Sequence, residues 1–407
     1  MTTSKSGGNI ATTLAFIGLM FFSIGFALGI NSFLVPVLQS SMKLPAAISY
    51  LLIGATFLPF LIFGLPASLC IDKIGYRKTI ALSFWIFALA FGGFIVSAYF
   101  QNFYLFLLAS FISGAANSFL QTAINPYITI VGPIESAAKR MSIMGVCNKL
   151  AWPVSPLFFT ILVPNATSVV VADLYLPFAI IIAIFVLLSM VSMVAPLPEV
   201  KAAGEGDDSA DQDAGECEYA KGKSSIWQFP HLVLGALTLF VYVGVETLSL
   251  GTAVDYAITL GLENPDLYAW IPSIGMVVGY ICGILFIPRI LSQEMAMRIC
   301  AVVGLLGAIA LVILPAVNSI WMLFIMSLGC SLMWPALWPL AIADLGRFTK
   351  SGSGLLTMAI AGGAVIPTIF GFLKDVTGMQ QAYWLAVPCF ATIFFYGFMG
   401  YKIRTKK

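Results

Sequence analysis

Long apolar runs separated by short polar segments are the dominant pattern of this chain. A helix of about 20 apolar residues crosses the hydrocarbon core of a bilayer, which is roughly 30 Å thick. Six runs of sufficient length lie near residues 11–38, 47–71, 79–99, 102–130, 141–164 and 170–196. Six more lie near 230–259, 266–289, 295–316, 319–344, 352–373 and 380–402. We therefore expect an all-α polytopic membrane protein with twelve spanning helices.

One long polar segment divides these runs into two sets of six. It carries a group of acidic side chains, namely Glu205, Asp207, Asp208, Asp211, Asp213, Glu216 and Glu218. A segment without an apolar period and with this charge is typical of a flexible, solvated linker. The pattern predicts an N-terminal six-helix bundle over 1–196, an acidic cytoplasmic linker over 197–228 and a C-terminal six-helix bundle over 229–407.

The composition excludes several classes of protein. Hydrophobic residues make up 60% of the 407 positions and charged residues only 9%, whereas a soluble domain carries about 25% charged residues. The net charge of +2 gives no field that would attract nucleic acid. His231 is the only histidine, and the seven cysteines form no CxxC pair. We expect neither an enzyme, nor a metal site, nor a disulfide framework.

Basic residues predict the orientation, because Lys and Arg concentrate in cytoplasmic loops. With the N-terminus inside, seventeen basic residues fall in inner segments, and only Lys43 and Lys374 fall in outer loops. Lys5 precedes a long apolar run without an evident cleavage site, so that run is interpreted as a first span and not a signal peptide. We expect both termini to be cytoplasmic and the protein to reside in the plasma (inner) membrane.

The two halves resemble each other weakly but in register. A shift of 214 residues places Met144 on Met358 and Pro153 on Pro367. Chance similarity between apolar helices is the alternative, but it would not also align the loops around a central linker. Two six-helix bundles related by a pseudo-two-fold axis along the membrane normal are the arrangement of the major facilitator halves, which bind substrate between them near the midplane.

The loop after the second span supports this interpretation. It reads Ser68-Leu-Cys-Ile-Asp-Lys-Ile-Gly-Tyr-Arg-Lys78 and resembles the signature cytoplasmic loop of the major facilitator superfamily, with Ser68 at the usual glycine and Lys73 at the usual arginine. An acid at a helix end can pair with basic residues, and a glycine permits a tight reversal. An ordinary positive loop is the alternative. The predicted conformational latch comprises Asp72, Gly75, Arg77 and Lys78.

Few charged side chains lie inside the predicted spans. A charge there costs at least about 2.5–3.5 kcal/mol, so each one is a functional candidate. Lys149 lies in span 5, Glu246 in the middle to outer part of span 7, and Asp255 near the outer end of that span. Because Lys149 and Glu246 belong to different halves, we predict a gating or coupling pair. Snorkelling of Lys149 or a pair within one half are the alternatives.

Uncharged polar residues form a second candidate group. Asn117, Gln121 and Asn125 recur every four residues and so share one face of span 4. Amides donate and accept hydrogen bonds, which suits a polyhydroxyl substrate, although hydrogen bonding between helices is the alternative. Tryptophan rings can stack on a sugar ring or simply pack. The predicted substrate-binding residues are Asn31, Asn117, Gln121, Asn125, Asn148, Trp152, Trp334 and Trp338.

At these residues the sequence resembles the fucose/galactose/glucose permeases of the superfamily. The more specific stretches are Leu120-Gln-Thr-Ala-Ile-Asn-Pro-Tyr-Ile-Thr-Ile-Val-Gly-Pro133 and Ala361-Gly-Gly-Ala-Val-Ile-Pro367. Fucose permeases carry an Asp in span 1 and a Glu in span 4, whereas this chain has Ser32 and Gln121. Asn148 matches a sugar-contacting Asn of the family, and Lys149 departs from the fucose-type pattern. The resemblance implies a sugar substrate but weakens fucose-type proton coupling, which makes Glu246 the leading candidate to carry a cation.

We therefore expect a secondary transporter that imports a neutral monosaccharide, such as glucose or galactose, by alternating access. Symport with H⁺ or Na⁺ is the favoured energetics, and no cofactor is expected apart from that ion. The alternatives are an ion-independent sugar uniporter and an exporter of apolar or cationic drugs. The expected partners are the sugar and the lipid bilayer, with no nucleic acid, and a monomer suffices for the fold.

Overall fold

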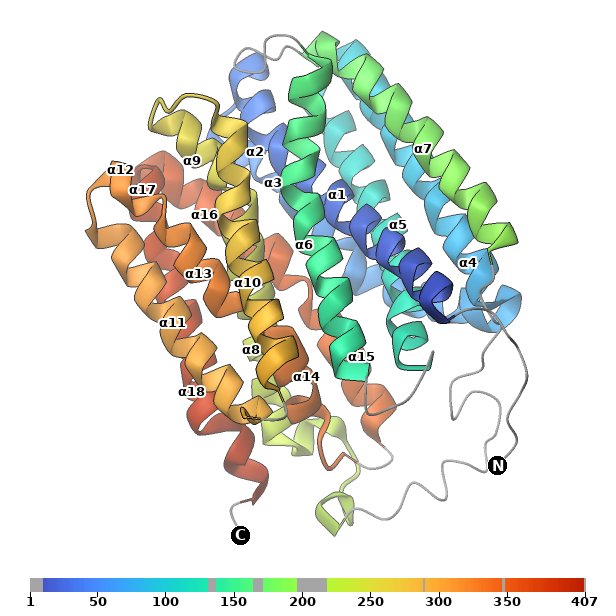
Figure 1. Cartoon of the computed structure of the whole chain (residues 1–407), viewed down its shortest axis with the longest axis vertical. Helices are drawn as coiled ribbons and strands as arrows, with labels where there is room; N and C mark the ends of the chain where they lie inside the picture. The colour runs from blue at the N-terminus through green and yellow to red at the C-terminus, as the bar shows by residue number, and fades with distance from the viewer. Residues whose placement is uncertain are drawn as a thin grey trace.

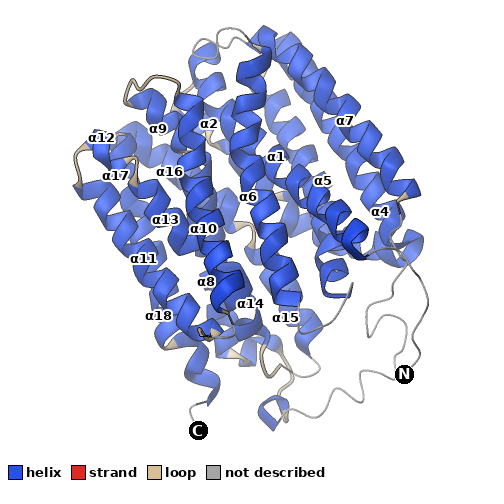
Figure 2. Ribbon diagram, viewed as in Figure 1, coloured by secondary structure: helices blue, strands red, loops and turns tan. Residues whose placement is uncertain are grey.

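Helices account for almost all of the described chain, and no strand occurs within it (Figure 2). The structure, a computed structural model, describes residues 10–130, 137–163, 171–195, 218–287, 290–345 and 348–405. The first half contains α1 Ile10–Met42, α2 Ala46–Ser49, α3 Leu51–Phe57, α4 Pro59–Phe100, α5 Phe103–Ile130, α6 Ala137–Leu162, η3 Val171–Leu174 and α7 Tyr175–Val194.

The second half begins after two short 3₁₀ turns, η4 Glu218–Ala220 and η5 Ile226–Gln228. It contains α8 Pro230–Gly251, α9 Ala253–Thr259, η6 Pro265–Ala269, α10 Trp270–Phe286, α11 Gln293–Ile313, α12 Ala316–Ser319, α13 Met322–Cys330 and α14 Met333–Ile342. The last helices are α15 Thr349–Ala359, α16 Gly362–Thr377, α17 Met379–Ala382, η8 Tyr383–Leu385, α18 Ala386–Phe398 and η9 Gly400–Thr405. Several predicted spans are thus built from two or three consecutive helices.

Eleven stretches of the described chain are long and apolar enough to span a bilayer. The twelfth span is α6, a helix of 26 residues that is more polar because it carries Lys149 and two internal prolines. It lies inside the bundle, packed on α1 in its own half and on α10 in the other. The predicted fold class, twelve helices in two bundles of six, is confirmed.

The two halves repeat the same internal packing. In the first half α1 packs on α6, α3 on α5, and α4 on α7. In the second half α8 packs on α16 and α15, α10 on α13, and α11 on α18. Span 1 therefore meets span 5, span 2 meets span 4, and span 3 meets span 6 in each half. Figure 1 shows the halves side by side, joined mainly where α6 lies beside α10 and where α3 lies beside α16.

Stacked phenylalanines hold the first half together behind α6. Phe87 and Phe185 lie with ring centroids 4.9 Å apart, and Phe94 and Phe178 with centroids 5.4 Å apart. Phe159 of α6 meets Phe178 edge-on at 5.7 Å. Such aromatic pairs contribute about 0.5–1.5 kcal/mol beyond their buried area. This packing fixes α6 against α4 and α7, and so positions its polar face toward the other half.

Gly75 makes the turn inside the predicted latch. Its φ of 82° and ψ of 167° interrupt α4 and separate spans 2 and 3, and essentially only glycine adopts this backbone conformation. The tight reversal predicted for this position is confirmed. Arg77 is partly buried and Lys78 is exposed, whereas the side chain of Asp72 lies outside the described residues. The latch itself therefore stays a prediction.

The end of the predicted linker is helical in part. Residues 196–217 lie outside the described residues, but 218–228 form η4 and η5. The Lys223 ammonium lies 3.3 Å from the ring centroid of Tyr219 and 4.0 Å from that of Phe229. Aromatic and cationic side chains therefore pack together just before α8, and the flexible linker over 197–228 stays a prediction.

The two ends of the bundle differ in charge. We call the end formed by the Gly75 turn, the start of α6 and η9 the basic end. The far end is the opposite one, where α1, α4, α9 and α16 finish. At the basic end, Asp344 after α14 pairs with Arg404 of η9 at 3.3 Å. Arg347, three residues further along the chain, lies outside the described residues.

Candidate functional site

A cavity of about 120 Å³ lies between the two halves. Helices α1, α5 and α6 line it from the first half, and α8, α10 and α14 line it from the second. Met141 and Ser142 in the first turns of α6 belong to its wall, as do Trp334 and Pro335 of α14. The cavity therefore extends from the centre of the bundle toward the basic end.

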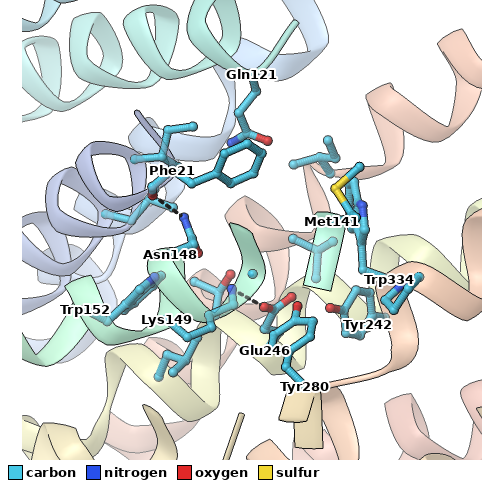
Figure 3. A pocket seen from close by; sticks show the side chains of 18 of the residues that line it. Phe21, Gln121, Met141, Asn148, Lys149, Trp152, Tyr242, Glu246, Tyr280 and Trp334 are labelled. Carbon is cyan, nitrogen blue, oxygen red and sulfur yellow. Dashed lines mark hydrogen bonds and ion pairs between the residues drawn. The ribbon is translucent and has the colours of Figure 1, made fainter. Parts of the chain in front are cut away.

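An ion pair crosses the cavity between the halves (Figure 3). Lys149 Nζ of α6 is in contact with Glu246 Oε1 of α8, and their side chains are only 12% and 10% exposed. Among the residues that line the cavity, no other is Asp, Glu, Lys or Arg. The structure brings together the two residues that the sequence analysis paired. Their role in coupling or gating stays a prediction.

Two tyrosines complete the surroundings of Glu246. Tyr242, one helical turn earlier on α8, lines the cavity beside Glu246 (Figure 3). Tyr280 of α10 lies beside them on the cavity wall. Its ring packs against Gly145 of α6, where an added Cβ would come within 2.8 Å of the ring. The glycine thus permits α6 and α10 to approach closely beside the ion pair.

Three of the predicted amide residues line the cavity, namely Gln121, Asn125 and Asn148. Asn148 Nδ2 donates to the backbone oxygen of Phe21 at 3.0 Å, which holds the amide against α1 (Figure 3). Gln121 Nε2 donates to Asn117 Oδ1 at 2.9 Å along α5. Each of these bonds uses an amide N–H, so the amide oxygens of Asn148 and Gln121 are available as acceptors at the wall.

The tryptophans divide between the cavity and the packing around it. Trp152 and Trp334 line the cavity from opposite halves. The indole N–H of Trp152 is buried and has no hydrogen-bond partner. Trp338 does not line the cavity; its ring lies 5.3 Å from that of Trp334, centroid to centroid. Its place is behind the wall, where it supports Trp334.

Two further predicted residues lie away from the cavity. Asn31 is 1% exposed and donates to the backbone oxygen of Ala27, while Ser110 donates to its Oδ1 at 2.8 Å. It therefore ties α1 to α5. Asn117 is also 1% exposed and accepts the bond from Gln121. Neither residue lines the cavity in this structure, and their role in substrate binding stays a prediction.

Asp255 belongs to a separate cluster at the far end. Lys374 Nζ lies 2.7 Å from Asp255 Oδ2, with side chains 13% and 4% exposed. The Tyr50 hydroxyl donates to the same carboxylate oxygen at 2.7 Å. The sequence analysis placed Lys374 in an outer loop, which was wrong: it lies in the last turn of α16 and is partly buried. The boundary of span 11 was drawn a few residues too early.

Sequence reasoning missed several residues of the site. Tyr242 precedes Glu246 by four residues, a spacing that places both on one helix face and could have identified it. Phe21, Met141 and Tyr280 carry no such signal, since aromatic and aliphatic residues occur throughout the spans. Within the described residues, no group of three or more His, Cys, Asp or Glu side chains is arranged to hold a metal ion.

Comparisons with known proteins identify relatives over the whole chain. The sequence pattern of the Major Facilitator Superfamily matches residues 16–368. A glucose/galactose transporter of Brucella abortus is 31% identical over 415 aligned positions, covering 98% of this chain and 97% of that protein. An L-fucose-proton symporter of Escherichia coli is 26% identical, covering 93% of this chain and 90% of that protein.

The fold has counterparts among solved structures. A crystal structure of the Escherichia coli fucose:proton symporter superposes with a TM-score of 0.70 at 22% identity, covering 98% of this chain and 100% of that one. At this identity the likeness shows the fold alone.

Proposed function

Since this chain belongs to the Major Facilitator Superfamily and is a multi-pass membrane transporter of sugars, resembling the fucose permeases, we propose that it imports a neutral hexose in symport with a proton. Alternating access between the halves would carry the sugar through the cavity. Its relatives include a glucose/galactose transporter and an L-fucose-proton symporter, and these substrates support a monosaccharide. The observation that carries the proposal is the lining of this cavity.

That lining suits an uncharged polyol. Gln121, Asn125 and Asn148 supply amide groups on one side, and Trp334 supplies an aromatic face on the other. Hydroxyl groups both donate and accept, so amides can satisfy them in either sense. Lys149 and Glu246 neutralise each other, so the wall presents no net charge to attract an ionic substrate. A neutral hexose fits this combination better than an anion or an organic cation.

The ion pair also favours a proton over a sodium ion. The Lys149 ammonium occupies the position at the Glu246 carboxylate that Na⁺ would need. A proton needs no such vacancy, because it can bind a carboxylate oxygen and release the ammonium. Protonation of Glu246 would then break the only ion pair that crosses the cavity among the described residues, so the charge state would be linked to the relative position of α6 and α8.

A uniporter is the second candidate. It is favoured by the same contact, because a carboxylate that is permanently neutralised by Lys149 needs no transported ion. In addition, Gln121 stands where fucose permeases carry a glutamate. The excess of basic residues at one end supports a cell-membrane orientation with both termini in the cytoplasm, and a single chain contains the whole cavity, which supports a monomer.

Counterflow of labelled sugar tests the substrate class. Purified protein in liposomes loaded with unlabelled glucose, galactose, fucose or N-acetylglucosamine is diluted into labelled glucose. We expect transient accumulation with glucose or galactose inside, and a reduced signal in Asn148→Ala. Lack of exchange with all four sugars would overturn the proposal. Counterflow needs no ion gradient, so it tests the sugar separately from the proton.

A further inference from the structure

A polar cluster joins the two halves at the far end, beyond the cavity. Its members from the first half are Gln39 of α1, the backbone of Ala46 and Ala47 in α2, and Tyr50 directly after α2. Its members from the second half are Asp255 of α9 and the neighbouring Lys374 and Asp375 of α16. We call these residues the far-end cluster. None of them lines the cavity.

Asp255 and Lys374 form the anchor of this cluster within one half. Both belong to the second half, and Lys374 Nζ lies 2.8 and 2.7 Å from the two carboxylate oxygens. Because both charges move with the same bundle, opening between the halves does not separate them. A buried charge that lost its partner would be strongly destabilising, so an anchor of this kind avoids that cost in both states.

The bonds between the halves are of a different kind. Asp375 accepts from the backbone N–H of Ala46 at 2.8 Å and of Ala47 at 2.7 Å. These are first-turn amides of α2, which have no partner within the helix. Tyr50 donates to Asp255 at 2.7 Å, and Lys374 donates to Gln39 Oε1 at 3.2 Å. Asp375 is exposed, so water can replace the protein donors when its bonds break.

We propose that the far-end cluster is the gate that closes this end of the transporter. The hydrogen bonds of Asp375 to the first half break when the gate opens, whereas the Asp255–Lys374 ion pair within the second half persists. In the structure the gate is closed, and the cavity extends toward the basic end. Opening requires α16 to leave α2, which breaks the four bonds between the halves and leaves the anchor intact. The gate operates whichever solute or ion is carried.

The size of the effect follows from the number of bonds. One hydrogen bond contributes about 0.5–1.5 kcal/mol net, which corresponds to roughly a twofold to tenfold change in an equilibrium constant. Asp375→Asn keeps the size of the side chain but removes the charge and one acceptor. Tyr50→Phe removes a single hydroxyl. Each variant should raise the ratio of open to closed molecules by about twofold to tenfold, and the double variant by the product.

Distances between spin labels measure this ratio without any substrate. Cysteines replacing Tyr99 in α4 and Val317 in α12 place labels on exposed sites in different halves at the far end, in a chain without its native cysteines. Double electron–electron resonance in nanodiscs then gives the distribution of distances. We expect a longer distance to gain population in Asp375→Asn, in Tyr50→Phe, and most in the double variant.

The matched control is Glu263→Gln, which removes an exposed acid at the same end outside the cluster. It should leave the distribution as in the parent. Identical distributions for the parent and the double variant would overturn the gate. A general loosening of the fold would instead broaden all distances, including those between two labels within one half. Failure of the sugar or proton proposals would not change the expected shift.

Discussion

The Lys149–Glu246 pair predicts a non-additive pattern of substitutions. The variants are Glu246→Gln, Lys149→Met and the two combined. Each single change leaves one charge in the cavity without its partner, whereas the double change removes both charges. The side chains are 12% and 10% exposed, so the remaining charge is poorly hydrated. We therefore expect each single variant to be less stable than the double variant.

The magnitude follows from opposing contributions. Unit charges 4 Å apart attract each other by about 4 kcal/mol at an effective dielectric constant of about 20. Desolvation costs several kcal/mol per buried ion, so the pair as a whole is close to neutral for stability. Removing one partner of a buried pair costs about 3–5 kcal/mol, whereas replacing both with apolar groups is often neutral. Two single losses of about 3–5 kcal/mol each, set against a nearly neutral double change, give a coupling energy of about 6–10 kcal/mol.

Apparent melting temperatures of the purified proteins in one detergent provide the assay. We expect each single variant to melt several degrees below the parent and the double variant to recover most of that loss. Glu246→Gln should also retain counterflow, because the amides that line the cavity are unchanged. Additive losses, in which the double variant is the least stable of the three, would show that Lys149 and Glu246 do not stabilise each other as an ion pair.

Two further predictions concern the cavity wall. Gly145→Ala should reduce counterflow severely, because the new Cβ would lie 2.8 Å from the Tyr280 ring. The control Gly92→Ala should leave counterflow unchanged, because no atom lies within 4 Å of its new Cβ. Equal activity of both variants would contradict the close approach of α6 and α10. Asn148→Ala should raise the KM for sugar about tenfold, because it removes an amide from the cavity wall. Asn31→Ala should lower the free energy of unfolding by about 1–3 kcal/mol and leave the KM for sugar unchanged. Sugar-concentration series and melting curves separate the two, and a raised KM in Asn31→Ala would contradict its place behind the wall.

The fold could be predicted from the sequence because lipid imposes a simple rule. A spanning helix must be long and apolar, so runs of about 20 residues mark the spans even without knowledge of their packing. α6 shows where this rule weakens. It carries a lysine and two prolines, so its apolar run at 141–164 is weaker than the others, and its contacts with α1 and α10 support its place as a span.

The candidate site could be predicted only in part. Charges inside spans are rare and costly, so Lys149 and Glu246 could be paired from the sequence. Amides carry less information, because Asn148 at the cavity and Asn31 between helices are the same residue type with the same cost of burial. Which of them faces the cavity depends on helix rotation. Lys374 was missed because the end of its span depends on a partner, Asp255, that lies 119 residues away in sequence.

Sugar accumulation under an imposed pH gradient tests the central claim most directly. Proteoliposomes containing the parent or Glu246→Gln are given labelled glucose or galactose, with the outside acidic and no sodium present. We predict that the parent accumulates sugar above the outside concentration and that Glu246→Gln only equilibrates it. Simple equilibration by the parent, or equal accumulation by Glu246→Gln, would contradict the assignment of Glu246 as the proton carrier.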